Sequence, residues 1–347
     1  MTDHEPFQRE PQKPQDPQVV VFSPELLKLA DRRRQALEDC RQAAEDGDAN
    51  AVVQMGMNCL YGIGGAAKDP EKAFRWFAQT APDDPAGLYW LGVCYDNGFG
   101  VERDEDRACR LYQESAAGDY APALCNLGVC YESGQGVEKN LEKAVELYRR
   151  AAEGGYPMGR CNLGVMYFFG QGVEKDLKKA AYCFAQAAEQ RLPRAQYLLG
   201  VCYETGDGVE KKPRYAAYMY HRAALQGHPE AMLRLGICYE TGVGTEKDPA
   251  IAANLYRRAA EQGSDLARCR LGRLYEQGLG VERDLRRAEE LYEAGTRAGV
   301  SGAKEALDRV RAALAAPPEP QPEDKPVDKK SPLRRLLDRL KGPKSEE

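Results

Sequence analysis

The sequence lacks the features that mark several large classes of protein. Its 49 lysines and arginines nearly balance 54 aspartates and glutamates, for a net charge of −5, so no excess of one sign points to nucleic acid. No stretch approaches the length of apolar sequence that spans a bilayer, and the polar, proline-rich first residues lack the charged and then apolar order of a secretion signal. We therefore expect a cytoplasmic protein that neither binds nucleic acid nor spans a membrane.

The eleven cysteines show neither paired spacing nor the clustered C-x-x-C arrangement of a zinc site, and only three histidines accompany them. An odd number of cysteines without a secretion signal is typical of reduced thiols that serve as small buried apolar side chains. The sequence therefore predicts no disulfide framework, no metal and no other cofactor.

What the sequence does contain is a strict repeat. One glycine, called here the marker glycine, recurs every 36 residues, at Gly56, Gly92, Gly128, Gly164, Gly200, Gly236 and Gly272. A period of this size indicates a solenoid in which each unit packs against its neighbours. The repeat outweighs the prior from chain length, which alone suggests two domains.

Each unit contains two amphipathic helices, A and then B. Ala123, Leu127 and Tyr131 follow helical spacing, and so do Ala144 and Tyr148 in the second half of the same unit. Between them a G-x-G-V turn carries two glycines, which predicts left-handed backbone there. The marker glycine lies inside helix A, where it costs about 1 kcal/mol relative to alanine, so we expect helix B to approach closely at that point.

These residues resemble the Sel-one-like repeat (SLR) family, relatives of the tetratricopeptide repeats. The third unit matches the family pattern at Ala123, Leu127, Gly128, Tyr131, Gly134, Gly136, Val137, Lys143, Ala144, Tyr148, Ala151 and Ala152. The resemblance covers about residues 51–299 and implies an all-α, right-handed α/α superhelical solenoid of seven repeats. The first unit departs from the pattern at Cys59 and Gly65, and Asn140 and Lys212 replace the usual aspartate, which puts local capping in doubt but not the fold.

The organisation expected along the chain follows from the repeat. Residues 1–22 are predicted to be a disordered tail and 23–47 an N-terminal capping helix, followed by the seven repeats over 48–300. Residues 301–315 are predicted to be a C-terminal capping helix with Ser301 as its N-cap. A proline- and charge-rich linker (316–330) and a basic amphipathic helix (331–347) complete the chain.

The resemblance implies that helix A lines the concave face and exposes fixed positions around the marker glycine. The position four residues after the marker glycine is acidic in most repeats, as at Glu132, Glu204, Glu240 and Glu276, and we call this series the acidic ladder. The simplest explanation of the ladder is a solvated face. The functional alternative is a groove for a basic protein segment or peptide, in which Asn126 and Asn162 supply amides and Phe168 and Phe169 an apolar anchor.

Three functions are compatible with the sequence. We expect a non-catalytic cytoplasmic adaptor or scaffold that binds a protein or peptide, with no small-molecule substrate. The first alternative is a peripheral membrane adaptor that uses the basic C-terminal helix on anionic lipid. The remote alternative is a β-lactamase-like hydrolase, because Ser301 and Lys304 match S-x-x-K, but the S-D-N and K-T-G elements that this chemistry requires are missing.

Overall fold

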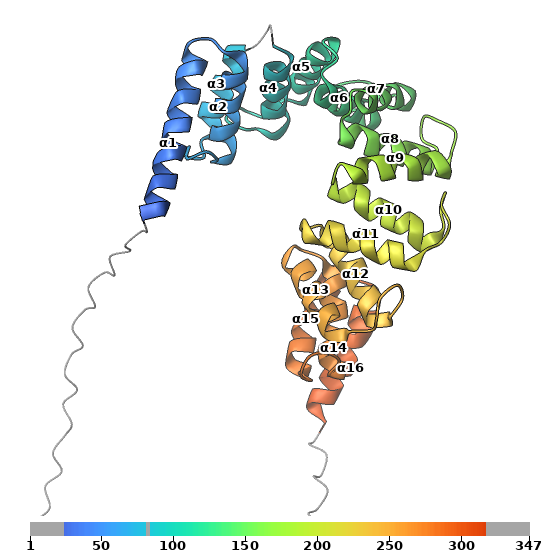
Figure 1. The fold of residues 1–347 in the computed structure, drawn as a ribbon. Coiled ribbons are helices and arrows are strands. Elements are labelled where there is room, and N and C mark those ends of the chain that lie inside the picture. The colour runs from blue at the N-terminus through green and yellow to red at the C-terminus, as the bar shows by residue number, and fades with distance from the viewer. Residues whose placement is uncertain (1–23, 81–83, 317–347) are drawn as a thin grey trace, which may run out of the picture. The chain divides into compact units, whose positions relative to one another are not determined.

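The computed structural model describes residues 24–80 and 84–316, and all regular structure within these ranges is α-helical (Figure 1). The A helices of the seven repeats are α2 (Ala49–Tyr61), α4 (Pro85–Asn97), α6 (Ala121–Ser133), α8 (Pro157–Phe169), α10 (Pro193–Thr205), α12 (Pro229–Thr241) and α14 (Asp265–Gln277). The B helices are α3 (Pro70–Thr80), α5 (Glu105–Ala117), α7 (Leu141–Glu153), α9 (Leu177–Glu189), α11 (Pro213–Leu225), α13 (Pro249–Glu261) and α15 (Leu285–Arg297). Helix α1 (Pro24–Glu45) precedes them and α16 (Ala303–Ala315) follows.

These helices form two compact units that divide between Lys247 and Asp248. The first unit holds α1 to α12 and the second α13 to α16, and within each unit every helix packs against the next one along the chain. The fold is an all-α repeat solenoid, as the sequence predicts.

The marker glycines allow the close approach of helix B that their cost predicts. A Cβ atom built on Gly128 of α6 would lie only 2.6 Å from the ring of Tyr148 in α7, and the Tyr148 side chain is fully buried. The same crowding recurs between Gly92 and Tyr112, Gly164 and Phe184, and Gly200 and Tyr220. Any larger residue at these positions would push helix B away from helix A.

The G-x-G turns join each repeat to the one before it. Both glycines of the turn after α6 have positive φ, 83° at Gly134 and 66° at Gly136, as expected. A Cβ on Gly136 would also lie 2.7 Å from the carbonyl oxygen of Glu105, the first residue of the preceding B helix. The second glycine of each later turn faces the start of the preceding B helix in the same way. The turn is therefore part of the interface between repeats.

Helix B begins at a side-chain cap in most repeats. Asp104, Asn140 and Asp176 each accept a hydrogen bond from the N–H group three residues later, as do Asp248 and Asp284. The doubt about Asn140 is resolved, because its amide oxygen performs the same task at 2.9 Å. Lys212 makes no side-chain cap, so α11 alone among α5, α7, α9, α11, α13 and α15 lacks one.

The predicted capping helices differ in detail from those observed. Helix α16 begins at Ala303, after Gly302 at a φ of 76° and without a side-chain cap, so the assignment of Ser301 as the N-cap is wrong. Gly302 takes that place because its left-handed backbone turns the chain into the helix. The predicted N-terminal tail, the C-terminal linker beyond residue 316 and the basic amphipathic helix lie outside the described residues.

Candidate protein-binding face

The acidic residues near the end of helix A are bound by the B helix of the same repeat. The buried hydroxyl of Tyr148 donates a hydrogen bond to Glu132 at 2.5 Å, and Tyr292 donates to Glu276 at 2.8 Å. The same bond joins Tyr220 to Glu204 and, at 3.3 Å, Tyr112 to Asp96. Each of these acids is partly buried, so the ladder is a structural element as well as a charged surface.

The tyrosine hydroxyls explain which residue occupies each step of the ladder. In the sequence, every repeat with an acid at this position has a tyrosine 16 residues later, as in the Glu132–Tyr148 pair. The fourth repeat has Phe168 and, 16 residues later, Phe184, which is buried and has no hydroxyl to bind. This pairing is readable within the single chain, but only when residues 16 positions apart are compared, because neither position reveals it alone.

Burial first, and then the hydrogen bond to the carboxylate, raises the pKa of Tyr148, Tyr220 and Tyr292 far above the ordinary value for tyrosine. These side chains stay neutral donors throughout the physiological range. A neutral hydroxyl orients a carboxylate without cancelling its charge.

Arginines neutralise part of the acidic ladder. Arg234 lies 3.3 Å from Glu204, and Arg309 of α16 binds both oxygens of Glu276 at 2.7 and 2.9 Å. The Arg309 contact, with the Tyr292 hydroxyl adding to it, lowers the pKa of Glu276 below its usual value. The negative charge of the ladder is therefore offset at Glu204 and Glu276.

The two asparagines expected on this face occupy different environments. Asn126 is partly buried, whereas Asn162 has only 9% of its surface exposed, so the expectation that Asn162 is exposed is wrong. Its amide donates to the Cys125 sulfur at 3.6 Å and accepts from Arg194 at 3.0 Å. Those partners belong to the neighbouring repeats, so Asn162 contributes to packing between repeats.

The aromatic pair at the end of α8 is the most exposed apolar feature of the expected site. Phe169 is 63% exposed, and its ring meets that of the partly buried Phe168 edge-on, with centroids 5.1 Å apart. An edge-on contact is a favoured arrangement of two aromatic rings. The structure thus places the exposed Phe169 beside Phe168, the one step of the ladder from Asp96 to Glu276 that carries no acid.

The cysteines are individual thiols, nine of them buried and Cys40 and Cys269 partly buried. Burial raises the pKa of Cys94 to about 12 and that of Cys202 to about 11, so these sulfurs stay protonated and unreactive at neutral pH. Across residues 24–80 and 84–316, no three His, Cys, Asp or Glu side chains come together as a metal site. Among the described helices, none combines the length and the apolar character needed to cross a bilayer.

The protein is an α/α repeat solenoid, because each pair of helices packs against the pair next to it along the chain within each unit. A model of the Sel1 repeat family matches residues 49–81, 85–120, 121–156, 157–192, 193–228, 229–264 and 265–300. The chain belongs to the Sel1 repeat family. Proteins of this family typically mediate protein–protein interaction and are generally non-catalytic.

Solved structures support the same assignment. A Sel1 repeat protein from Oxalobacter formigenes is 30% identical and superimposes with a TM-score of 0.60 over 81% of each chain. The protein c5321 of uropathogenic Escherichia coli, described as a protective antigen with an SLR fold, is 33% identical, with a TM-score of 0.65. That match covers 79% of this chain and 59% of c5321.

A curated relative matches over a shorter stretch. It is the DAP3-binding cell death enhancer 1 of Rattus norvegicus, 33% identical over 96 residues, which is 26% of this chain and 18% of the rat protein. The chain thus spans less than two thirds of the length of both the rat protein and c5321.

Proposed function

We propose that this protein is a non-catalytic cytoplasmic adaptor that holds a partner protein or peptide on its helix A face, with the Phe168–Phe169 pair as the anchor. The observation that carries the proposal is the exposure of Phe169, 63%, in a ring that packs edge-on against Phe168. A large aromatic side chain held in place in solvent loses little conformational entropy when a partner covers it, and such residues often dominate binding energy.

The charges around this anchor favour a segment with basic residues. Glu132 lies one repeat before Phe168, and its bond from the neutral Tyr148 hydroxyl leaves its negative charge in place. Asp96, one repeat before Glu132, accepts a hydrogen bond from Tyr112 in the same manner. Because Arg234 offsets Glu204, we propose that the basic residues of the ligand lie on the N-terminal side of Phe168. Asn126, which is partly exposed, would supply an amide on that side.

The burial of single, unpaired thiols supports a reducing compartment such as the cytoplasm. The alternative of a peripheral membrane adaptor depends on residues 331–347, which lie outside the described structure. Its test is whether removal of these residues abolishes pelleting of the protein with anionic liposomes.

The experiment starts from a partner captured by affinity purification with crosslinking. Phe169→Ala should then speed dissociation of that partner about tenfold or more, because a buried aromatic anchor is commonly worth 2 kcal/mol or more. Leu225→Ala at the end of the B helix α11 is the matched control, since this apolar side chain is 68% exposed and lies outside the helix A face. Wild-type dissociation of the Phe169→Ala variant would contradict the proposal.

Charge reversal on the ladder is a poorer test. Glu132→Lys would remove the acceptor of the buried Tyr148 hydroxyl, so it would change folding as well as binding. Phe169 makes no hydrogen bond through its side chain, and its removal leaves the helix pair intact.

A further inference from the structure

The B helices of the fourth and fifth repeats carry several exposed cations and few acids. Helix α11 contains no acidic residue, and α9 contains only Glu189 at its end. In α5, α7 and α15, three acids in each helix are mixed among the cations, and α3 and α13 contain one acid each. Helices α9 and α11 thus combine exposed cations with a single acid between them, in a chain whose net charge is −5.

This face is also rich in exposed tyrosine. We call it the tyrosine–lysine face, and it consists of the exposed residues Lys178, Lys179 and Tyr182 of α9, Lys211 and Lys212 of the turn, and Arg214, Tyr215 and Tyr218 of α11. Its three tyrosines are 67%, 55% and 56% exposed, in sequence order.

Two of the three tyrosines, Tyr215 and Tyr218, make ring contacts with neighbouring side chains. Tyr215 packs against the ring of Tyr203, with centroids 5.6 Å apart, and the Lys212 ammonium lies 5.9 Å from its centroid. The Arg222 guanidinium lies at the same distance from the ring of Tyr218. Amphipathic rings that are already ordered supply contact area to a partner at a low entropic cost.

The two helices of this face are connected through the intervening turn. The second glycine of that turn, Gly208, packs directly against the carbonyl group of Leu177 at the start of α9. At the other end of the helices, Arg222 of α11 reaches the carbonyl oxygen of Ala188 at 3.5 Å. Helices α9 and α11 are therefore neighbours within the first unit.

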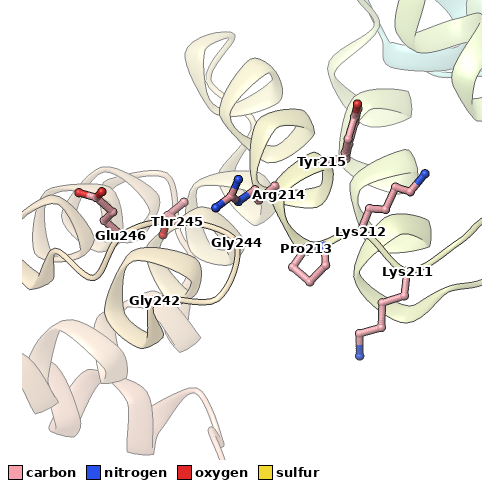
Figure 2. Close-up of a pocket in the computed structure, with 9 residues that line it drawn as sticks. All are labelled: Lys211, Lys212, Pro213, Arg214, Tyr215, Gly242, Gly244, Thr245 and Glu246. Carbon is pink, nitrogen blue, oxygen red and sulfur yellow. The ribbon is translucent and has the colours of Figure 1, made fainter.

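A hollow of about 890 Å³ opens at the N-terminal end of α11, lined by Lys211, Lys212, Arg214 and Tyr215 and by the turn around Thr245. Figure 2 shows the Arg214 side chain reaching from the start of α11 toward Thr245, with Lys211 and Lys212 on the far side of Pro213. The Thr245 hydroxyl is shielded from solvent and has no hydrogen-bond partner. The hollow therefore offers cations and the Tyr215 ring to a ligand, whereas the Thr245 hydroxyl beside it is covered.

The start of α11 adds to the positive potential of the hollow. Because Lys212 stands where the other B helices have a capping carboxylate or amide, no side chain accepts the first N–H groups of this helix. These groups and the helix dipole favour an anion there. Two acids oppose the effect: Glu246 lines the hollow, and Glu210 pairs with Lys212 at 2.8 Å, an exposed pair that an incoming carboxylate can displace.

We propose that the tyrosine–lysine face binds an acidic segment of a second partner protein. Carboxylates of the segment contact Lys211, Lys212 and Arg214 at the hollow, and its apolar groups cover Tyr215, Tyr218 and Tyr182. Charge complementarity selects this occupant, since the face presents cations and aromatic rings with few acids. This surface lies on the B helices, so the inference stands independently of the Phe168–Phe169 anchor.

The test uses the full chain and a fluorescent glutamate-rich peptide with a central leucine, with a lysine-rich peptide of the same length as the negative probe. The double variant Lys211→Glu/Arg214→Glu should weaken binding of the acidic peptide at least tenfold and flatten its salt dependence. The matched control is Arg110→Glu/Arg149→Glu, because both arginines are exposed on the B helices α5 and α7. The control should bind the peptide like the wild type.

Zero-length carbodiimide crosslinking locates the peptide directly. Its carboxylates should couple to Lys211 and Lys212 and not to Lys139, which occupies the same place in the turn of the third repeat as Lys211 does in the fifth. Tyr218→Ser should weaken binding without changing the circular dichroism spectrum or the melting temperature, since this side chain is 56% exposed.

Three outcomes would overturn the inference: no binding of the acidic peptide to the wild type, equal binding by both charge variants, or crosslinks spread evenly over the chain's lysines. Binding of anionic vesicles or an oligonucleotide in place of the peptide would also overturn it, because the occupant would then not be a protein segment. Phe169→Ala should leave peptide binding unchanged, which separates failure here from failure of the proposed helix A anchor.

Discussion

The Tyr148–Glu132 pair allows a quantitative test of how helix A is held to helix B. The perturbation is to convert this step of the ladder to the composition of the fourth repeat, where both positions are phenylalanine. Three variants are needed: Tyr148→Phe, Glu132→Phe and the double replacement. If the two residues act as a unit, the double replacement costs less stability than the two single replacements added together.

The structure sets the magnitudes. The hydroxyl and carboxylate oxygens are 2.5 Å apart, and a hydrogen bond to a charged group contributes about 1.5–3 kcal/mol. Tyr148→Phe should fall near the lower limit, because Glu132 is only partly buried and water can replace the lost donor. Glu132→Phe should cost about 1–3 kcal/mol, because it leaves a hydroxyl on a fully buried tyrosine without its acceptor.

The double variant has neither a stranded hydroxyl nor a carboxylate in need of a partner. We expect its cost to be about 1–2 kcal/mol smaller than the sum of the single costs. Urea denaturation gives the free energies, and hydrogen exchange in α6 and α7 shows whether the change stays local, since repeat arrays can unfold in parts. Tyr182→Phe, at an exposed side chain, is the control and should change stability by less than about 0.5 kcal/mol. A double cost equal to the sum would refute the pairing.

Two further predictions concern the turns and the thiols. Gly155→Ala should destabilise the protein by about 1–2 kcal/mol, because the residue has a positive φ of 81°. Gly172→Ala should destabilise it more, because the added Cβ would also clash with the carbonyl of Leu141 in the preceding repeat. Equal losses in melting temperature would show that the turn does not pack against the preceding repeat. Burial raises the pKa of Cys94 and Cys125 from 9.0 to about 12, so unfolded chains release these protons above pH 9 while folded chains retain them. Stability should therefore be complete below pH 9 and decline as the pH rises toward 12, and urea midpoints that stay constant from about pH 8.5 to about pH 10.5 would contradict the protonated state of the buried thiols.

The sequence predicted the parts of the fold that repeat. The constant place of Gly128 in every unit identified the close approach of helix B, and the paired glycines of the turn predicted their positive φ. The sequence did not predict the environment of residues that contact other repeats. Asn162 is buried because Arg194 and Cys125 bond to it, and neither partner is implied by the position of Asn162 within its own repeat.

The candidate site was predictable only in outline. Position alone marked Glu132 and Glu204 as one ladder, but the tyrosine hydroxyls and Arg234 that determine their charge and exposure come from other helices. A comparison of residues 16 positions apart would have revealed the tyrosines, because Phe168 breaks the pattern together with Phe184. The tyrosine–lysine face was not predicted, because the resemblance to tetratricopeptide repeats assigns binding to helix A and this face lies on the B helices.

The packing of each G-x-G turn against the previous repeat affects how the chain folds during synthesis. Gly136 closes against the first residue of α5, so the start of that helix gains its full set of contacts only after the next repeat's turn has left the ribosome. Folding from the N-terminus therefore lags behind translation by about one repeat. A truncated chain that stops at the end of a B helix exposes a carbonyl and an apolar edge that the following turn would have covered, and the boundary chosen for a shortened protein should retain that turn.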